Sequence, residues 1–429
     1  MRSVLERVIA PFAVDRRVLA LAGARMADGI GNSFLIIVIP LYVTSGIVGG
    51  TAFGLGESLI IGLILSLFGF LNSSFQPVTG RLSDRFGRRK PFILVGLAGL
   101  ALTNIAYVFA ETYVSLLVIR GLQGASVAFI IPASVALVNE LASSGDRGGN
   151  MGVYNTFRLL GFGAGPAVAG AVVNLGPYTL PGGVTVNGFD AAFYIATITA
   201  TISYVLVTVL VSDPDSTAAN AGADLSIPIR DRTGPNLLDP IFTLGLASFF
   251  MATGIALFAT IQPQVNARLE QGATWFGLQF AAFILAQVAL QTPIGRACDR
   301  YGRRPFIVGG MVLLIPTTLV QGFILSSMLM FVARLFQGVA AAMVFAPSLA
   351  LAGDLAGKGE SGSKLSVLTM AFGYGIAAGP LSSGALVGFG FRVPFVFGSV
   401  LAVFGAILVY TQVEETLETT APVPVFGSE

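Results

Sequence analysis

The stretch GRLSDRFGRR at residues 80–89 recurs 215 residues later as GRACDRYGRR at residues 295–304. Two shorter patterns recur at nearly the same offset: RGLQG at 120–124 with RLFQG at 334–338, and Gly165-Pro166 with Gly379-Pro380. Because three patterns recur in the same order, we predict that the chain consists of two copies of one structural unit.

The composition is strongly apolar. Hydrophobic residues make up 54% of the 429 residues and charged residues only 11%, whereas a soluble domain carries about 25% charged residues. A large soluble enzyme is therefore excluded, and the net charge of +2 gives no reason to expect nucleic acid binding. Histidine is absent and Cys298 is the single cysteine, which excludes internal disulfides, His-ligated metal sites and histidine catalysis. We expect no metal and no cofactor.

Apolar runs long enough to cross a bilayer, about 20 residues each, occur twelve times. They lie near residues 18–43, 57–79, 91–110, 113–137, 150–173, 190–212, 241–265, 274–297, 305–325, 328–350, 362–388 and 391–412. The runs are continuous and do not alternate with a period of two, so a β-barrel is not expected. The fold class predicted is an all-α membrane protein with twelve transmembrane helices in two parallel six-helix repeats.

The basic residues predict the orientation of these spans. Of the 24 Lys and Arg residues, eighteen fall on the side that holds the N-terminus, four lie inside spans, and only Arg268 and Arg392 fall on the opposite side. Basic loops remain in the cytoplasm, so both termini are predicted to be cytoplasmic in the plasma membrane. No cleaved signal is expected, because the first span is too long and too polar inside.

A polar stretch divides the chain. Residues 213–239 are the longest such segment and contain five aspartates. We interpret it as a cytoplasmic linker between one six-helix bundle at 1–212 and another at 240–412, with 413–429 as a short, disordered cytoplasmic tail. Parallel halves of this kind, related by an axis along the membrane normal, are the architecture of one large class of transporters.

The repeated motif resembles the G-x-L-x-D-R-x-G-R-[RK] loop of the major facilitator superfamily, and the resemblance extends over nearly the whole chain. The matching positions are Gly80, Leu82, Asp84, Arg85, Gly87, Arg88 and Arg89, and again Gly295, Asp299, Arg300, Gly302, Arg303 and Arg304. The second copy has Ala297 in place of the leucine. The resemblance implies that Asp84 helps to latch the two halves in an outward-facing state. Glu140 and Asp354, at matched span ends, are expected to pair with these arginines. The alternative is a topology signal alone.

The fifth span resembles the antiporter motif G-x8-G-x3-G-P-x2-G-G of the same family. The matching residues are Gly152, Gly161, Gly165, Pro166 and Gly170, with Ala169 replacing one glycine. Glycines at this spacing let another helix approach closely, and the proline kinks the span. The resemblance favours the drug:proton antiporter branch over uptake symporters. Ordinary small-residue packing remains the alternative.

The fourth span resembles a further motif of the family, L-x3-R-x2-Q-G-x3-A, whose arginine is linked to proton transfer. Here it comprises Leu116, Arg120, Gln123, Gly124 and Ala128. Arg120 lies about two turns from the outer end of its span, and an unpaired charge at that depth is costly. We therefore expect a carboxylate partner for Arg120.

Asp28 is the single acid, of 22, that lies clearly in mid-span. It is about ten residues into the first span, or roughly 15 Å, with Arg25 one turn before it on the same face. Arg158 lies at a similar depth in the fifth span, so Asp28, Arg25, Arg120 and Arg158 are expected to form one buried network. Asp28 is interpreted as a proton carrier or, alternatively, as a static counter-ion. Met251 occupies the matching place in the second half.

The function predicted is secondary active transport by alternating access, with protons as coupling ion and export of a small or drug-like molecule. The alternative is an uptake symporter or facilitator for a sugar, metabolite or organic anion, with Arg25, Arg120 and Arg158 binding a negative substrate. A non-transporting receptor or scaffold on the same fold is a third class. No G-x4-G-K-[ST] nucleotide loop occurs, so ATP drive is not expected. We expect a monomer in the lipid bilayer and not an enzyme.

Overall fold

Long helices build the molecule. The computed structural model describes residues 15–51, 54–141, 147–214, 229–231, 236–355 and 361–416. In this part of the chain, twelve helices are long and apolar enough to cross a membrane, which confirms the predicted fold class and number of spans. Most of the predicted linker (215–228 and 232–235) and of the tail (417–429) lies outside the described residues.

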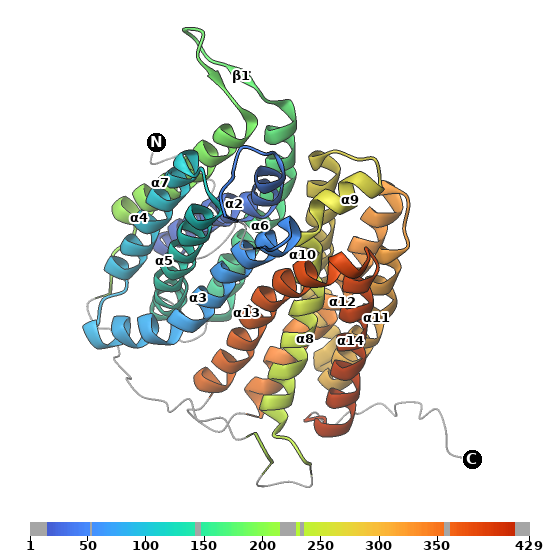
Figure 1. Cartoon of the computed structure of the whole chain (residues 1–429). Coiled ribbons are helices and arrows are strands. Elements are labelled where there is room, and N and C mark those ends of the chain that lie inside the picture. The colour runs from blue at the N-terminus through green and yellow to red at the C-terminus, as the bar shows by residue number, and fades with distance from the viewer. Residues whose placement is uncertain are drawn as a thin grey trace.

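The first half contains six of the long helices and a small hairpin (Figure 1). Its elements are α2 (Arg16–Thr44), α3 (Glu57–Phe86), α4 (Lys90–Ala106) with the 3-10 turn η2 (Tyr107–Phe109), α5 (Tyr113–Glu140), α6 (Arg147–Leu175), β1 (Tyr178–Thr179), β2 (Thr185–Val186) and α7 (Gly188–Leu210). The two strands pair antiparallel, with Tyr178 opposite Val186. The hairpin extends from the molecule between α6 and α7. The pattern of apolar runs does not predict it.

The second half repeats the arrangement of long helices without a hairpin in its described residues. Its elements are α8 (Pro240–Thr260), the short α9 (Gln262–Arg268), α10 (Ala273–Tyr301), α11 (Arg303–Leu319) with η3 (Val320–Gly322), α12 (Ser327–Asp354), α13 (Ser361–Leu386) with η4 (Val387–Phe389), and α14 (Val393–Gln412). Asp239 caps α8, because its carboxylate accepts hydrogen bonds from the N–H groups of Ile241 and Phe242.

The repeated motif is mostly helical, which corrects the expectation that it forms a loop. Helix α3 continues through Gly80 to Phe86, seven residues beyond the predicted end of the span. Charged side chains end an apolar run, but they do not end a helix. Gly87 does so, because it adopts the left-handed conformation with φ of 61° and its N–H bonds to the Asp84 carbonyl. Gly302 follows α10 with a φ of 96°.

The two halves touch mainly along two pairs of helices, α3 with α13 and α6 with α10. We call the end of the molecule that carries β1 and β2 the hairpin end, and the opposite end, with residues 80–89 and 295–304, the basic end (Figure 1). Between the hairpin end and the middle, hydrogen bonds of the described residues join the halves: Ser66 to the Ala377 carbonyl (2.5 Å), Gln264 to Ser58 (2.7 Å) and Ser74 with Tyr374 (3.1 Å).

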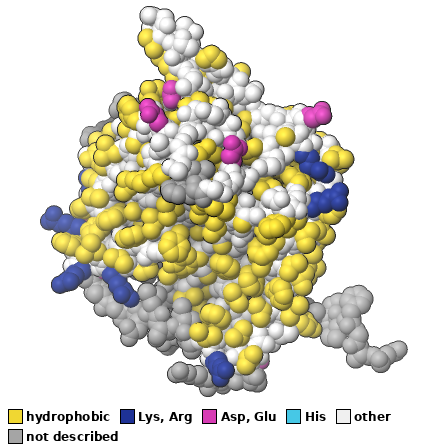
Figure 2. Space-filling model, in the orientation of Figure 1, with side chains coloured by type: hydrophobic (Ala, Val, Ile, Leu, Met, Phe, Trp, Pro, Cys, Tyr) yellow, Lys and Arg dark blue, Asp and Glu magenta, His cyan; other side chains and the backbone are white. Residues whose placement is uncertain are grey.

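Much of the outer surface is apolar. Figure 2 shows hydrophobic side chains over most of the middle of the visible face, with charged side chains toward its margins. Large side chains such as Leu102, Val118 and Ile202 are exposed on the long helices. A soluble monomer rarely exposes so large an apolar area, so this surface is suited to the acyl chains of a bilayer.

Candidate functional site

Asp28 lies inside the first six-helix bundle. Its side chain is 3% exposed and forms an ion pair with Arg25, one turn earlier on α2. The backbone of α2 can approach α6 closely here because residue 29 is glycine: a Cβ at Gly29 would lie 3.2 Å from the Arg158 carbonyl oxygen. The predicted pair of Asp28 and Arg25 is present. It lies where α2 packs against the part of α6 that carries Arg158.

Arg158 on α6 faces the same region without a carboxylate of its own. Its Nε donates a long hydrogen bond to Asn155 Oδ1 (3.4 Å). No acidic side chain of the described residues lies within 4 Å of its guanidinium. Arg158 lies within electrostatic reach of Arg25 and of Tyr154, a buried tyrosine on α6. The interior of the first bundle near Asp28 therefore holds two neighbouring cations, Arg25 and Arg158, and one anion.

Arg120 is held by one amide and an aromatic ring, and no carboxylate of the described residues pairs with it, so the expectation of a carboxylate partner is wrong there. Its Nη1 donates to Gln123 Oε1 at 2.9 Å, and its guanidinium carbon lies 4.4 Å from the centre of the Phe68 ring. Gln123 in turn donates to Asn104 Oδ1 (2.6 Å) and accepts from the Tyr107 hydroxyl (2.9 Å). Amide oxygens and a π face partly replace the hydration of the buried cation.

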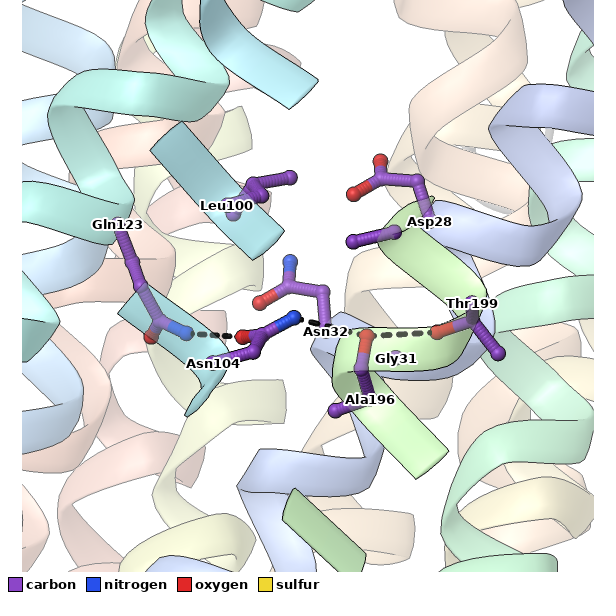
Figure 3. Close-up of a pocket in the computed structure, with 9 residues that line it drawn as sticks. Asp28, Gly31, Asn32, Leu100, Asn104, Gln123, Ala196 and Thr199 are labelled. Carbon is purple, nitrogen blue, oxygen red and sulfur yellow. Dashed lines mark hydrogen bonds between the residues drawn. The ribbon is translucent and has the colours of Figure 1, made fainter. Parts of the chain in front are cut away.

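The predicted four-residue network is therefore two separate groups, the pair Asp28–Arg25 and the cluster around Arg120. They face each other across a narrow cavity, whose lining includes Asp28, Asn32, Asn104, Gln123 and Thr199 (Figure 3). In Figure 3 the Asn32 amide lies between the Asp28 carboxylate and the Gln123–Asn104 pair. Asn32 is four residues after Asp28, so helical spacing alone places it on the same face.

A second cavity touches Asp28 from the other direction. Its lining includes Arg25, Ile93, Leu97 and Ser134, positions nearer the basic end than Leu100 and Asn104 of the first cavity. It offers about 10 Å³ of space, roughly the room that one water requires, whereas the first cavity offers none. Asp28 thus lies between a water-sized space toward the basic end and a narrower space, lined in part by Asn32, Asn104 and Gln123, toward the hairpin end.

The second half repeats the arginine cluster but not the acid. Arg334 donates to Gln337 Oε1 (2.5 Å), and Gln337 donates to Thr318 Oγ1 (3.0 Å), a position 214 residues after Asn104. Met251, at the place that matches Asp28, is buried. Both halves use the arginine–glutamine pair, so the pair alone does not distinguish them. The distinctive groups of the first half are Asp28 and its two neighbouring arginines.

The glycines of the antiporter-type motif serve two different contacts. Added Cβ atoms at Gly161 and Gly165 would lie 2.9 Å from the Met26 carbonyl carbon and 2.7 Å from the Ile30 oxygen, both on α2. A Cβ at Gly170 would lie 2.8 Å from the Ala273 carbonyl carbon on α10, and Pro166 packs against Gly277 of the same helix. Gly152 has nothing within 4 Å of that position. The motif therefore joins α6 to its own half and to the other half.

Arg89 organises the first copy of the repeated motif. Its guanidinium contacts Glu140 (2.8 Å) and Asp84 (2.5 Å) and is 3% exposed. Burial alone would lower the pKa of Arg89, but the hydrogen bonds to Glu140 and Asp84 raise it above its usual value. The expected pairing of Glu140 is present. Asp84 contacts its own half here, so its role as a latch between the halves stays a prediction.

The second copy is similar but more exposed. Arg303 pairs with Asp354 and more distantly with Asp299 (3.4 Å). Arg85, Arg88 and Arg300 are exposed and form no ion pair with an acid of the described residues. The two matched glycines differ: an added Cβ would contact Pro132 at Gly80 and would meet nothing within 4 Å at Gly295. Arg304 donates its side chain to the Tyr410 carbonyl.

Two acids that the sequence did not single out cap helices at the basic end. Asp213, just after α7, accepts hydrogen bonds from the N–H groups of Arg89 (3.0 Å) and Lys90 (2.9 Å) at the start of α4. Glu415, just after α14, accepts from the N–H of Arg304 (2.8 Å) at the start of α11. Residues 413–416 of the expected tail are described, and Glu415 among them makes this contact. Both acids lie just after the last helix of their repeat, and this shared position is the signal in the sequence that could have predicted the two caps.

Comparison with known proteins supports the resemblance drawn from the motifs. A sequence model described as Major Facilitator Superfamily matches residues 21–274 and 244–425. Multidrug resistance protein 2 of Bacillus subtilis (strain 168) is 28% identical over 178 residues, which are 41% of this chain and 44% of that protein. The class B tetracycline resistance protein of Escherichia coli is 24% identical over 266 residues, 58% of this chain and 60% of that protein. The chain thus spans less than two thirds of the length of these curated relatives.

Solved structures share the fold. A bacterial homologue of the human lysosomal transporter Spinster, in an inward-facing and occupied conformation, superposes with a TM-score of 0.76 at 13% identity, over 92% of this chain and 95% of that one. The human organic anion transporter MFSD10 superposes with a TM-score of 0.65 at 19% identity, over 92% and 99%. At these identities the likeness concerns the architecture alone.

Proposed function

The chain belongs to the Major Facilitator Superfamily, and we propose that this transporter exports a small molecule in exchange for protons. The observation that carries the proposal is Asp28, a buried carboxylate on a membrane-spanning helix between two cavities. The names of the similar multidrug and tetracycline resistance proteins support export over uptake.

The chemistry follows from the charges around Asp28. When its carboxylate is ionised, it neutralises Arg25, whereas the neighbouring Arg158 has no carboxylate partner among the described residues. Protonation of Asp28 would leave two neighbouring cations in a poorly solvated place, and an uncompensated buried charge is strongly unfavourable. The protonated protein would therefore favour a conformation in which α2 and α6 bring these cations toward water, and this difference couples the proton to the conformational change.

The conformation supports alternating access. The halves are joined between the hairpin end and the middle, and transport requires that this contact open while the basic end closes. We propose that the basic end faces the cytoplasm, because eighteen Lys and Arg residues are assigned to that side. The structure then corresponds to a state whose halves are joined on the side away from the cytoplasm.

Substitution of Asp28 in proteoliposomes tests the proposal. The probes are ethidium, tetracycline and 1-naphthoate, a cation, a zwitterion and an anion, with internal pH reported by trapped pyranine. Asp28→Asn should abolish proton movement on addition of a transported probe but retain exchange of that probe across the membrane. Asp28→Glu should retain coupling with a shifted pH optimum. Glu57→Gln, at an exposed acid that opens α3, is the control.

A static role for Asp28 gives a different result. Asp28→Asn would then destabilise the protein by stranding Arg25, and the double variant Asp28→Asn with Arg25→Gln would restore both stability and proton-coupled transport. Coupled transport by that double variant overturns the proposal.

Uptake is the second candidate, and the excess of buried arginines over acids favours it for an anionic substrate. The direction of the gradient separates the two functions. An antiporter accelerates probe movement against the direction of proton flow, whereas a symporter accelerates it in the same direction.

A further inference from the structure

Arg334 on α12 is a completely buried cation with unused hydrogen-bonding capacity. Its side chain is 0% exposed, and its Nη1 donates to Gln337. Its Nε and Nη2 have no hydrogen-bond partner, and no carboxylate of the described residues lies within 4 Å. At the matching position of the first half, Arg120 likewise donates from Nη1 to a glutamine oxygen, and its buried Nε has no hydrogen-bond partner. The second half therefore holds a positive charge that the described protein atoms do not neutralise.

Aromatic rings surround this guanidinium. Its central carbon lies 4.5 Å from the ring centre of Phe258 on α8, and 4.8 Å and 5.5 Å from those of Phe283 and Phe280 on α10. We call these three phenylalanines and Arg334 the aromatic cage. Cation–π contacts stabilise a guanidinium but satisfy none of its N–H groups. The free Nε and Nη2 donors form one edge of the guanidinium, and such an edge binds a carboxylate through two parallel hydrogen bonds.

The cage lies next to the contact between the halves. The Phe280 ring centre is 6.3 Å from that of Phe162 on α6, and one turn earlier on α10, Gly277 packs against Pro166. Opening of the hairpin end must separate α6 from α10 along this line, which uncovers the cage on its Phe280 side. A ligand that enters there meets the Phe280 ring, whose centre lies 5.5 Å from the guanidinium carbon of Arg334.

We propose that the aromatic cage binds an organic anion, a carboxylate carried on an aromatic or other apolar body. The carboxylate pairs with Nε and Nη2 of Arg334, and the apolar body packs among the phenylalanines. Transport of that anion rests on the proposed function, but binding to the cage requires no proton coupling. The cage thus assigns a substrate class to the second half, whereas Asp28 lies in the first.

Thermal unfolding of the purified full chain tests the binding. The probe is 1-naphthoate, and 1-naphthamide is its neutral control of nearly equal shape. Naphthoate should raise the unfolding temperature of the unmodified protein, and naphthamide should not. Arg334→Gln should remove the shift. Arg334→Lys keeps the charge but loses the two-donor edge, so it should weaken naphthoate binding roughly tenfold or more. Arg120→Gln, the matched change in the first half, should retain the shift.

The ligand-free variants separate binding from a merely structural role. Removal of an uncompensated cation should leave the unfolding temperature of Arg334→Gln unchanged or higher. Equal shifts with naphthoate and naphthamide, no shift with naphthoate, or a full shift in both Arg334 variants would overturn the proposal. Asp28→Asn should keep the naphthoate shift. An Arg334-dependent shift without any proton-coupled flux would therefore contradict the proposed function and leave the anion site standing.

Discussion

The arginines of the repeated motif are held differently from the matched pair Arg120 and Arg334. At the basic end Arg89 and Arg303 use carboxylates from two helices. In the middle of the bundles Arg120 and Arg334 use glutamine oxygens and phenylalanine rings. An amide fixes the position of a cation without cancelling its charge, so the positive charges of Arg120 and Arg334 are not cancelled by these contacts.

A substitution of Asp84 can distinguish a latch between the two halves from the local ion pair with Arg89. In Asp84→Asn, Arg89 keeps Glu140, so we expect the unfolding free energy to fall by less than about 1 kcal/mol. If Asp84 also pairs across the halves in the other conformation, the variant should slow transport and increase the population of the state described here. Asp299→Asn, at the more exposed acid of the second copy, is the control. Unchanged flux in Asp84→Asn would reduce the motif to a topology signal.

At the scale of elements, one face of α6 packs against α2 of the same half, and another face packs against α10 of the other half. Gly161 and Gly165 hold it against α2, and Pro166 with Gly170 holds it against α10. The first contact belongs to the stability of one bundle, and the second belongs to the closed hairpin end.

Gly170→Val should therefore open the hairpin end. The added Cβ would lie 2.8–2.9 Å from backbone atoms of Ala273 and Thr274, which cannot move aside without separating the helices. A cysteine introduced at Ser58 in a Cys298→Ser background should react faster with a membrane-impermeant maleimide in this variant. Gly152→Val, where a Cβ meets nothing within 4 Å, should leave the labelling rate unchanged. Equal rates in the two variants would contradict a role of Gly170 in closure.

Prediction from sequence succeeded for features that depend on a local pattern. It failed where residues from another helix determine the partner of a side chain. The twelve spans, the duplication and the Asp28–Arg25 pair depend on neighbouring residues or on simple periodicity. The partner of Arg120 depends on Asn104 and Tyr107, which reach Gln123 from a different helix. The end of α3 was missed because hydropathy measures where the apolar slab ends, whereas Gly87 determines where the helix ends.

At the scale of the whole molecule, the two halves move against each other only if the contact of α3 with α13 breaks. The Ser66 hydroxyl reaches the Ala377 carbonyl across this contact at 2.5 Å. The chain has one native cysteine, buried in α10, so a designed pair of thiols would report on this contact alone.

The pair Ser66→Cys and Ala377→Cys should form a disulfide in the state described here. The crosslinked protein should neither exchange nor accumulate a transported probe, because the hairpin end cannot open, and reduction should restore flux. Each single variant, treated with the same oxidant, should transport normally. Continued transport by fully crosslinked protein would show that the halves do not rock about this contact.

The caps at the basic end bear on how independent the two repeats are. Asp213 accepts hydrogen bonds from backbone N–H groups at the start of α4, and Glu415 accepts one at the start of α11. In each repeat, the acid that caps the third membrane helix therefore comes from the segment just after the last helix of the same repeat. A polypeptide divided between residues 214 and 229 would give two fragments that each retain this acid. The division would remove no contact that the described residues make with one another, which makes co-expressed fragments a route to isotope labelling of one repeat at a time.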